Sequence, residues 1–383
     1  MRPQQFATTI SAMLLAALAP PYTLAIDPPP MPRLAASVSG ETTKVGIQLD
    51  NYMQMRGSRD HFTGTVLVAQ NGKFLLARGY GYANAEWKTP NTLQTRFRLG
   101  SLTKQFTATA IMQLREKGLL SLQDSLCKYL QPCVEAWKPV TLHHLLSHTS
   151  GIAGYGDLTE PKTRAIPPWT AKQVAAQFRD KPLEFAPGTR WLYSDWGYCL
   201  LGLVIESVTG KPYAQILSEQ IFEPLGMHDT GYDQPETILE QRAAGYRLVV
   251  GRLENAEYIN MAGPYSAGAL YSTAQDLYKW DQALYTEAIL PRSALALMWT
   301  EVTSNYGYGW MVSTPTSASK PPWALPKRFQ VVHPGSINGF TSEILRFPDE
   351  HLTVIVLANL EDAHVVGPDL AAMVLGDPFK LPD

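Results

Sequence analysis

The stretch RLGSLTKQF, residues 98–106, contains the four-residue pattern S-x-x-K as Ser101 to Lys104. On a helix, residues at this spacing lie on one face, so the polar ends of Ser101 and Lys104 would be within reach of each other. A lysine that has lost its proton is a base that can activate a serine hydroxyl. The pattern therefore indicates acyl-transfer chemistry, although S-x-x-K also occurs by chance as a serine near a helix start with an exposed lysine.

The segments around this tetrad predict how it is held. Asn71-Gly72 separates two apolar runs and is typical of a tight hairpin turn. Ser101 would stand at the start of a largely buried helix, where free backbone N–H groups and the helix dipole favour negative charge. The expected elements are a helix at 45–55, strands at 64–69 and 73–84, and a helix from Thr103 that ends at Gly118.

The later chain is first helical and then strand-rich. Strands at both ends with helices between them predict one antiparallel sheet built from both ends of the chain, with flanking helices. The fold class is therefore α/β (α+β), with 41–118 and 266–383 as the α/β part and 119–265 as a mostly helical insertion. Helices are expected at 141–148, 198–209 and 369–375, and a further helix should begin at the capping box of Thr273 and Asp276. Strands are expected at 306–312, 328–335, 339–347 and 351–359.

Composition places the chain among ordinary globular proteins. Its 383 residues are 45% hydrophobic and 17% charged, enough to bury a large core in one big domain or two closely joined ones. The formal net charge is -2, and neither sign forms a long run. Nucleic acid is therefore an unexpected partner, and no internal repeat is evident.

The first 25 residues have the pattern of an export signal. Arg2 precedes a mostly apolar stretch at 7–19, and Thr23-Leu24-Ala25 resembles a cleavage site. We expect export to the periplasm or the extracellular space, with an uncleaved anchor as the alternative. No later segment reaches the roughly 18 to 20 apolar residues of a membrane span. A proline-rich leader at 26–40 would then precede a catalytic domain at 41–383.

Three cysteines are compatible with an exported protein. Cys127 and Cys133 are close enough in sequence to bridge a small loop in an oxidising compartment, whereas Cys199 lies in an apolar run and is expected to be buried. Sequence alone does not fix the pairing. There is no C-x-x-C pair, which argues against a thiolate zinc site.

Two distant stretches give the tetrad its context. WLYSDWGY at 191–198 places Tyr193, Ser194 and Asp195 just before a predicted helix, and VHPGSINGF at 332–340 enters a predicted strand. Taken alone, the first is explained by helix capping beside a core tyrosine. The second is explained by a glycine-containing turn with a hydrogen-bonded histidine.

In the order and spacing of these three stretches, the chain resembles the serine β-lactamase and penicillin-recognising enzyme superfamily. The likeness is to the class C β-lactamase-related branch, which also contains D-alanyl-D-alanine carboxypeptidases and esterases. It covers roughly residues 45–358, and the ordered set of motifs is more specific than any one of them. The matching stretches are Ser101 to Lys104, Tyr193-Ser194-Asp195, His333-Pro334-Gly335, HLLSHTSGI at 144–152, GALYSTAQDLYKW at 268–280 and YGYGW at 306–310.

The resemblance implies a role for each motif. Ser101 would be the nucleophile, Lys104 its base, and Tyr193 a partner that moves the proton to the leaving group. Backbone N–H groups of Ser101 and Ser336 would form the oxyanion hole. An acyl-enzyme on Ser101 would form without any metal or organic cofactor, and the partner would be a small-molecule or peptide acyl substrate. Asp195, His333 and Gly335 would contact it.

Two departures from the family pattern affect the expected substrate. Asp195 stands in place of asparagine, and its charge favours protonated Lys104. Either Tyr193 carries more of the base role, or Asp195 points away, or it shares a proton. His333 stands where lysine is common and Pro334 where threonine is usual, which weakens the hold on a substrate carboxylate. Proline also suits a strand with a free edge along the cleft.

We therefore expect an esterase-like serine hydrolase. The alternatives are a D-alanyl-D-alanine carboxypeptidase or β-lactamase, and a non-catalytic penicillin-binding or sensor protein. His143, His144 and His148 suggest a metal site only weakly, since H-E-x-x-H is absent. No stretch fits the G-x-S-x-G nucleophile elbow. The oligomeric state is not predicted.

Overall fold

A computed structural model of the protein describes residues 43–152, 171–176, 179–234, 236–317, 321, 323–363 and 366–378. All of these belong to one unit, Pro32–Asp383. The predicted signal at 1–25 and the leader at 26–40 lie outside the described residues. Within the described segments, no helix is both long and apolar enough to cross a membrane.

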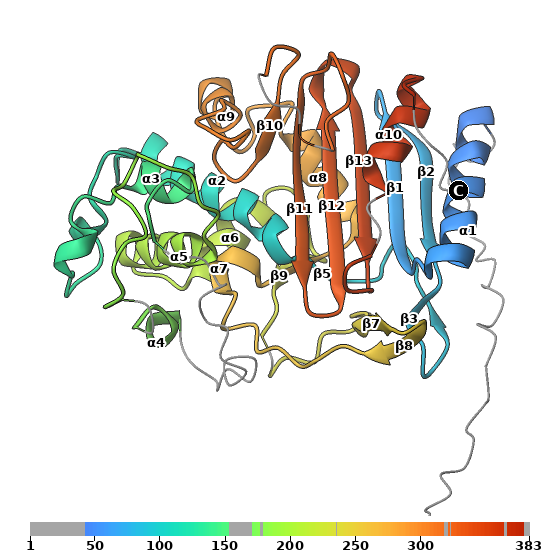
Figure 1. Ribbon diagram of the computed structural model, residues 1–383, viewed down its shortest axis with the longest axis horizontal. Coiled ribbons are helices and arrows are strands. Elements are labelled where there is room, and N and C mark those ends of the chain that lie inside the picture. Colours follow the sequence, from blue (N-terminus) through green and yellow to red (C-terminus); the bar gives the residue numbers. More distant parts are fainter. Residues whose placement is uncertain are drawn as a thin grey trace, which may run out of the picture. The chain divides into compact units, whose positions relative to one another are not determined.

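The centre of the fold is a six-stranded antiparallel sheet in the order β10-β11-β12-β13-β1-β2 (Figure 1). The first and last parts of the chain meet in its middle, where β1 pairs with β13 and Val66 lies opposite Val356. This confirms that both ends of the chain build one sheet. The strands are β1 Gly64–Gln70, β2 Lys73–Tyr80, β10 Met311–Ser313, β11 Gln330–Ile337, β12 Phe340–Phe347 and β13 Leu352–Ala358.

The hairpin between β1 and β2 has the predicted turn. Asn71 and Gly72 have φ of 50° and 74°, the left-handed conformation that a two-residue hairpin of this type needs. Asparagine and glycine adopt that conformation more readily than other residues. The local sequence therefore fixes where the first strand pair reverses.

Helices cover both faces of the sheet, which makes three layers (Figure 1). Successive side chains of a strand point to opposite faces, so Val66 packs with α1 (Lys44–Asp60) and α10 (Gly367–Leu375). Its neighbour Leu67 joins the core that contains α2 (Thr103–Glu116) and α8 (Ala274–Ala283). Nearly every residue of β1 and β13 is buried for this reason.

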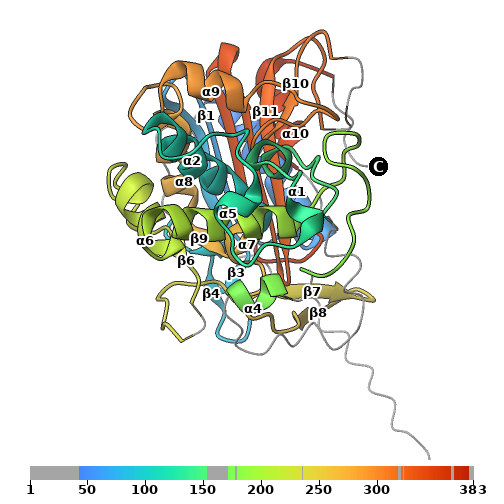
Figure 2. The same ribbon diagram turned by 90° about the vertical axis from the view of Figure 1, so that its left-hand side faces the viewer.

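The insertion is mostly helical, as expected, and its helices lie on the α2 side of the sheet, to the left of the sheet in Figure 1 and in front of it in Figure 2. Its α-helices are α3 Leu142–Leu146, α4 Ala171–Ala176, α5 Asp195–Thr209 and α6 Tyr213–Leu217, and α7 Tyr265–Gly268 and α9 Arg292–Met298 follow. Shorter helical turns are Gly100–Leu102, Leu126–Lys128, Glu135–Trp137, Ser218–Phe222 and Pro348–Glu350. Small sheets pair β3 Tyr82–Asn84 with β4 Thr89–Pro90, β7 Tyr246–Val249 with β8 Arg252–Asn255, and β5 Phe97–Arg98 and β6 Gly231–Tyr232 with β9 Leu270–Ser272.

The prediction of a strand over 306–312 was wrong for its first five residues. Only Met311 onward belongs to β10, and the segment before it is an irregular loop against α2. Gly309 has φ of 74°, and a Cβ at this position would lie 2.7 Å from the carbonyl oxygen of Lys104. Gly309 therefore allows a close backbone approach to α2 that a regular strand would not make, and Gly307 allows a similar approach to the carbonyl oxygen of Met298.

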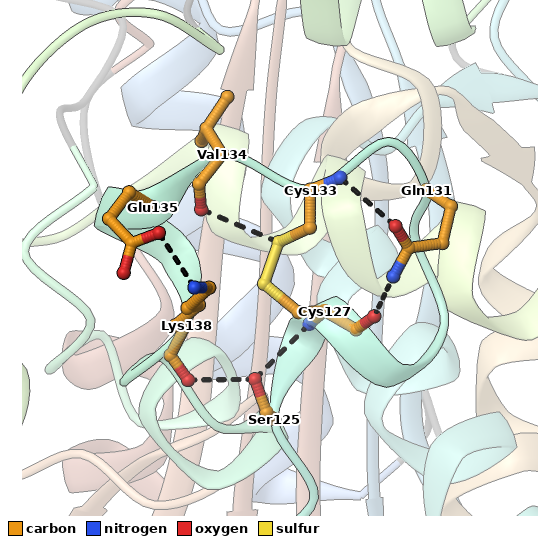
Figure 3. The surroundings of a disulfide bond; sticks show 7 residues. All are labelled: Ser125, Cys127, Gln131, Cys133, Val134, Glu135 and Lys138. Carbon is orange, nitrogen blue, oxygen red and sulfur yellow. Dashed lines mark hydrogen bonds and ion pairs between the residues drawn. A yellow bond between two sulfur atoms is a disulfide. The ribbon is translucent and has the colours of Figure 1, made fainter.

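Cys127 and Cys133 are joined by a disulfide in the structure (Figure 3). The bond closes the small loop after the helical turn that begins at Leu126, and Ser125 caps this turn by accepting from the Cys127 N–H. Cys199 is a free, buried cysteine on α5, as its apolar surroundings indicated.

Candidate active site

Ser101 lies in a helical turn, Gly100–Leu102, that leads directly into α2. The backbone of β11 packs tightly against this turn. A Cβ on Gly100 would lie 2.9 Å from the Ser336 nitrogen, and one on Gly335 would lie 2.1 Å from the Leu99 carbonyl oxygen. Two glycines, one on each segment, therefore let the backbone next to Ser101 and the backbone of Ser336 come together.

The amine of Lys104 makes hydrogen bonds to three other groups of the site. The side chain of Lys104 is fully buried, at 0% exposure. Its Nζ lies 2.9 Å from Ser101 Oγ, 2.6 Å from Asp195 Oδ1 and 2.9 Å from the carbonyl oxygen of Ala267. The spacing of S-x-x-K on one helix face thus places the amine beside the hydroxyl, as predicted.

The surroundings of Lys104 favour its charged form. Burial lowers the pKa of its amine, but the negative charge of Asp195 and interaction with Tyr193 outweigh burial, and the net pKa is raised. As an ammonium, Lys104 donates one hydrogen bond to each of its three partners. As a neutral amine it would keep two N–H groups for the carboxylate and the carbonyl, and its lone pair would face Ser101 Oγ.

Asp195 does not point away from the site, which removes one of the three explanations for this replacement. Ser194 is the N-cap of α5 and accepts from the Gly197 N–H, and Asp195 is the first residue of that helix. Capping and the ion pair with Lys104 are therefore both present in the same three residues. Asp195 remains 23% exposed, so the pair opens toward solvent.

Tyr193 lies directly over the amine, with its ring centroid 4.8 Å from Lys104 Nζ. Burial raises the pKa of its hydroxyl, and the charge of Asp195 adds to the rise, while Lys104 and Ser101 act in the opposite direction. The net pKa is above the ordinary value of a tyrosine. At neutral pH the side chain is therefore a phenol that can donate a proton, not a phenolate.

His333 is buried, at 1% exposure, and both ring nitrogens are occupied. Its Nδ1 lies 2.6 Å from the Pro334 carbonyl oxygen, which only accepts, so the ring proton is on Nδ1 and Nε2 accepts from the Tyr306 hydroxyl at 3.0 Å. Burial and the nearby charge of Lys104 lower the pKa of this imidazole to about 3. His333 is therefore neutral at physiological pH.

Among the described residues, no strand pairs with the β10-facing edge of β11 beyond Val332, as Pro334 indicated. β10 pairs only with Gln330 to Val332 of β11. On its other side β11 pairs with β12 along its whole length, including Pro334 opposite Glu343. Pro334 and Ser336 are exposed.

Three groups at the site were missed from the sequence. The Ala267 carbonyl is a backbone group and leaves no residue signature, although Thr107 also fixes this segment by donating to the Ser266 carbonyl at 2.6 Å. Tyr306 and His148 lie within YGYGW and HLLSHTSGI, so their stretches were recognised without their contacts. His148 is buried, and its Nδ1 accepts from the Ser194 N–H at 3.1 Å.

The three histidines near α3 have separate hydrogen-bond partners. His143 Nδ1 lies 2.7 Å from the Tyr308 hydroxyl, and His144 Nδ1 accepts from the Thr141 N–H. Among the described residues, no group of three or more His, Cys, Asp or Glu side chains is arranged to hold a metal ion.

Comparison with known proteins agrees with this geometry. The family model described as Beta-lactamase matches residues 49–375. Penicillin-binding protein 4* of Bacillus subtilis is 29% identical over 361 residues, which are 88% of this chain and 77% of that protein.

Two solved structures extend the comparison. The octameric penicillin-binding protein homologue from Pyrococcus abyssi is 29% identical with a TM-score of 0.75, and the match covers 88% of this chain and 78% of that one. A D-stereospecific amidohydrolase from Streptomyces sp. is 26% identical with a TM-score of 0.68, and the match covers 83% of this chain and 96% of that one. The family match includes all three motifs, so this chain belongs to the β-lactamase family of serine hydrolases and penicillin-binding proteins.

Proposed function

We propose that the protein is an exported serine hydrolase that cleaves esters through an acyl-enzyme on Ser101. The observation that carries the proposal is the buried amine of Lys104, which lies 2.9 Å from Ser101 Oγ and is fixed by two further acceptors. A nucleophile within hydrogen-bond reach of a base that other groups orient is the arrangement that covalent catalysis needs.

In the proposed reaction Lys104 first loses a proton, which its surroundings disfavour, and Ser101 Oγ then attacks the substrate carbonyl while its own proton moves to the neutral amine. Asp195 stabilises the ammonium that forms. The Ser101 and Ser336 N–H groups stabilise the oxyanion. Tyr193 then donates its proton to the leaving oxygen and is reprotonated from Lys104. Water repeats these transfers in the opposite sense and releases the acid.

The preference for esters rests on the charge at the third motif. His333 is neutral and bound to Tyr306 and Pro334, so it offers no cation to a substrate carboxylate. Asp195 adds a partly exposed negative charge at the second motif. Substrates with a free carboxylate next to the scissile bond are therefore poor candidates.

An amide substrate with a free amino group is the second candidate. The partly exposed carboxylate of Asp195 would attract an ammonium group, and a D-stereospecific amidohydrolase is among the similar structures. D-Alanyl-D-alanine peptides and penicillins remain alternatives because a similar protein is named penicillin-binding protein 4*.

The experiment compares kcat/KM for p-nitrophenyl butyrate, a D-amino acid amide and an acylated D-alanyl-D-alanine peptide. We expect the ester to be preferred over the peptide by about tenfold or more, and Ser101→Ala to lose activity on every substrate. Efficient cleavage of the peptide with no cleavage of the ester would refute the preference. Repeated turnover excludes a pure binding protein, which would stop after one acylation or react with nothing.

Export is part of the proposal because residues 1–25 have a signal pattern. The N-terminal sequence of protein recovered outside the cytoplasm tests it. We expect the chain to begin at Ile26. Retention of Met1 with its apolar stretch would indicate an uncleaved anchor instead.

A further inference from the structure

His148 holds the backbone on both sides of Tyr193. Its carbonyl oxygen accepts from the Leu192 N–H at 2.9 Å, and its Nδ1 accepts from the Ser194 N–H at 3.1 Å. The residue before Tyr193 and the residue after it are therefore bonded to the same histidine. Because a segment that is hydrogen-bonded on both sides has little freedom to shift, these two bonds fix the position of the Tyr193 backbone and so of its Cβ.

The imidazole of His148 also packs against the tyrosine ring. The two ring centroids are 4.3 Å apart at an interplanar angle of 36°. The same imidazole lies 5.1 Å from the Tyr198 ring and 4.6 Å from the Tyr306 ring, so aromatic groups surround it. At 1% exposure it has no room to move independently of Tyr193.

Two features of His148 lower the stability of the folded protein. Its φ is 59°, in the left-handed region that costs energy for a residue with a side chain. Because Nδ1 accepts, the proton of the neutral ring is on Nε2, and this buried nitrogen has no hydrogen-bond partner among the described residues. Such strained or unsatisfied groups cluster at functional sites.

Burial and the charge of Lys104 keep this ring neutral by lowering its pKa well below the ordinary value. The neutral tautomer is the one that leaves Nδ1 free to accept from Ser194. The cationic partner of Ser101 thus helps to keep His148 in the form that holds the tyrosine.

We propose that His148 is a positioning residue that holds Tyr193 over Lys104 and Ser101 for proton transfer. The proposal rests on the proposed role of Tyr193 in the acyl-transfer reaction. His148 itself touches no reacting atom in this account. It acts through two backbone bonds and one ring contact.

Three variants separate these contributions. His148→Ala removes the acceptor and the ring. His148→Asn removes the ring but supplies a side-chain oxygen that can accept from the Ser194 N–H, and asparagine tolerates the left-handed backbone. His148→Phe keeps an aromatic ring without the acceptor. The matched control is His144→Ala, which removes an imidazole whose Nδ1 also accepts a backbone N–H, that of Thr141, away from Tyr193.

Activity is measured with p-nitrophenyl butyrate as kcat and KM per active site, with sites counted by end-point fluorophosphonate labelling. Misfolded protein is thereby excluded from the comparison, and thermal unfolding is followed in parallel. We expect His148→Ala and His148→Phe to lose kcat about 10- to 100-fold with KM changed by less than about threefold. His148→Asn should recover most of the lost kcat, and His144→Ala should keep it.

Wild-type kcat per labelled site in His148→Ala would overturn the proposal. So would equal losses in His148→Asn and His148→Ala, because the acceptor would then not matter. An equal loss in His144→Ala would show a general effect of removing an imidazole near α3. The proposed function has its own test, since activity unchanged in Ser101→Ala would refute it whatever the His148 variants show.

Discussion

Three ion pairs among the described residues have a buried cation, and two of them differ in what surrounds the cation. Arg346 and Asp281 are both 0% exposed. Lys104 is equally buried, but its partner Asp195 is 23% exposed and Ser101 lies beside the amine. The first pair is sealed within the core and the second opens on a reactive hydroxyl.

The groups around the sealed pair, Arg346–Asp281, explain why it is fully buried. Asp281 also accepts from the Thr353 hydroxyl at 2.6 Å, and the guanidinium of Arg346 lies 4.7 Å from the Tyr285 ring and 5.1 Å from the Trp299 ring. A planar guanidinium is well suited to packing on aromatic rings. The comparison teaches that burial of an ion pair does not by itself mark a functional site. An adjacent nucleophile and access to solvent do.

Replacing the cation of the open pair, Lys104–Asp195, should have the largest effect, and this effect should be on activity rather than on stability. Lys104→Met removes the base for Ser101, and we expect kcat to fall by about 10³- to 10⁴-fold, or about 4–5.5 kcal/mol of barrier. Stability should change little, because water can reach Asp195 once the amine is gone. The measurement is ester turnover together with thermal unfolding. A folded variant that retains a tenth of the wild-type kcat would contradict the assigned role.

The same replacement in the sealed pair should act on stability instead. Arg346→Met leaves the carboxylate of Asp281 buried without its cation, and we expect a loss of about 3–5 kcal/mol of unfolding free energy. The kcat of the folded fraction should stay within about twofold of wild type. Urea unfolding and active-site titration measure both quantities. A large loss of kcat per folded site with unchanged stability would reverse the comparison.

Glu343 sharpens the comparison because it is a buried carboxyl with no ion-pair partner among the described residues. It accepts from the Gly367 N–H, and burial raises the pKa of its carboxyl to about 7. The folded-state pKa exceeds the unfolded value, so its contribution is fully present at low pH and is lost as pH rises through about 7.

The expected size of this effect is about 2 kcal/mol of unfolding free energy between pH 5 and pH 8. Glu343→Gln has no titrating group and should flatten that part of the stability profile. Urea unfolding at several pH values measures the difference between the two proteins. Parallel profiles for wild type and variant would show that Glu343 does not titrate in this range.

The smallest expected effect concerns the anion of the open pair. Asp195→Asn removes the charge that holds the pKa of Lys104 up, so the neutral amine should appear at lower pH. Because the base must be deprotonated, activity rises with pH through the pKa of Lys104. We expect this rising limb of the kcat/KM profile for an aryl ester to move about one pH unit lower. A limb that stays in place or moves upward would show that Asp195 does not control the base.

The site was most predictable where contacts are local. The spacing of Ser101 and Lys104 and the turn at Asn71-Gly72 depend on residues close in sequence, and both appear as expected. The helix cap was expected at Ser194 or Asp195, and the structure has it at Ser194. The single sheet followed from strand patterns at both ends of the chain. These features need only local backbone geometry and side-chain periodicity.

Contacts between distant segments were not predictable in the same way. The Ala267 carbonyl that binds Lys104 is a backbone atom, and any residue type would provide it. The bonds from Leu192 and Ser194 to His148 likewise involve backbone groups brought together by the fold. The loop at 306–310 looked like a strand because its aromatic residues alternate with glycines, whereas Gly309 allows close packing against α2 and Gly307 allows it against Met298.

The central claim is that Ser101 is the activated nucleophile. The most direct measurement is the intact mass of wild type and of Ser101→Ala after incubation with a fluorophosphonate. The account predicts one adduct on the wild type and none on the variant. An adduct of equal extent on both proteins, or no adduct on the wild type, would contradict it.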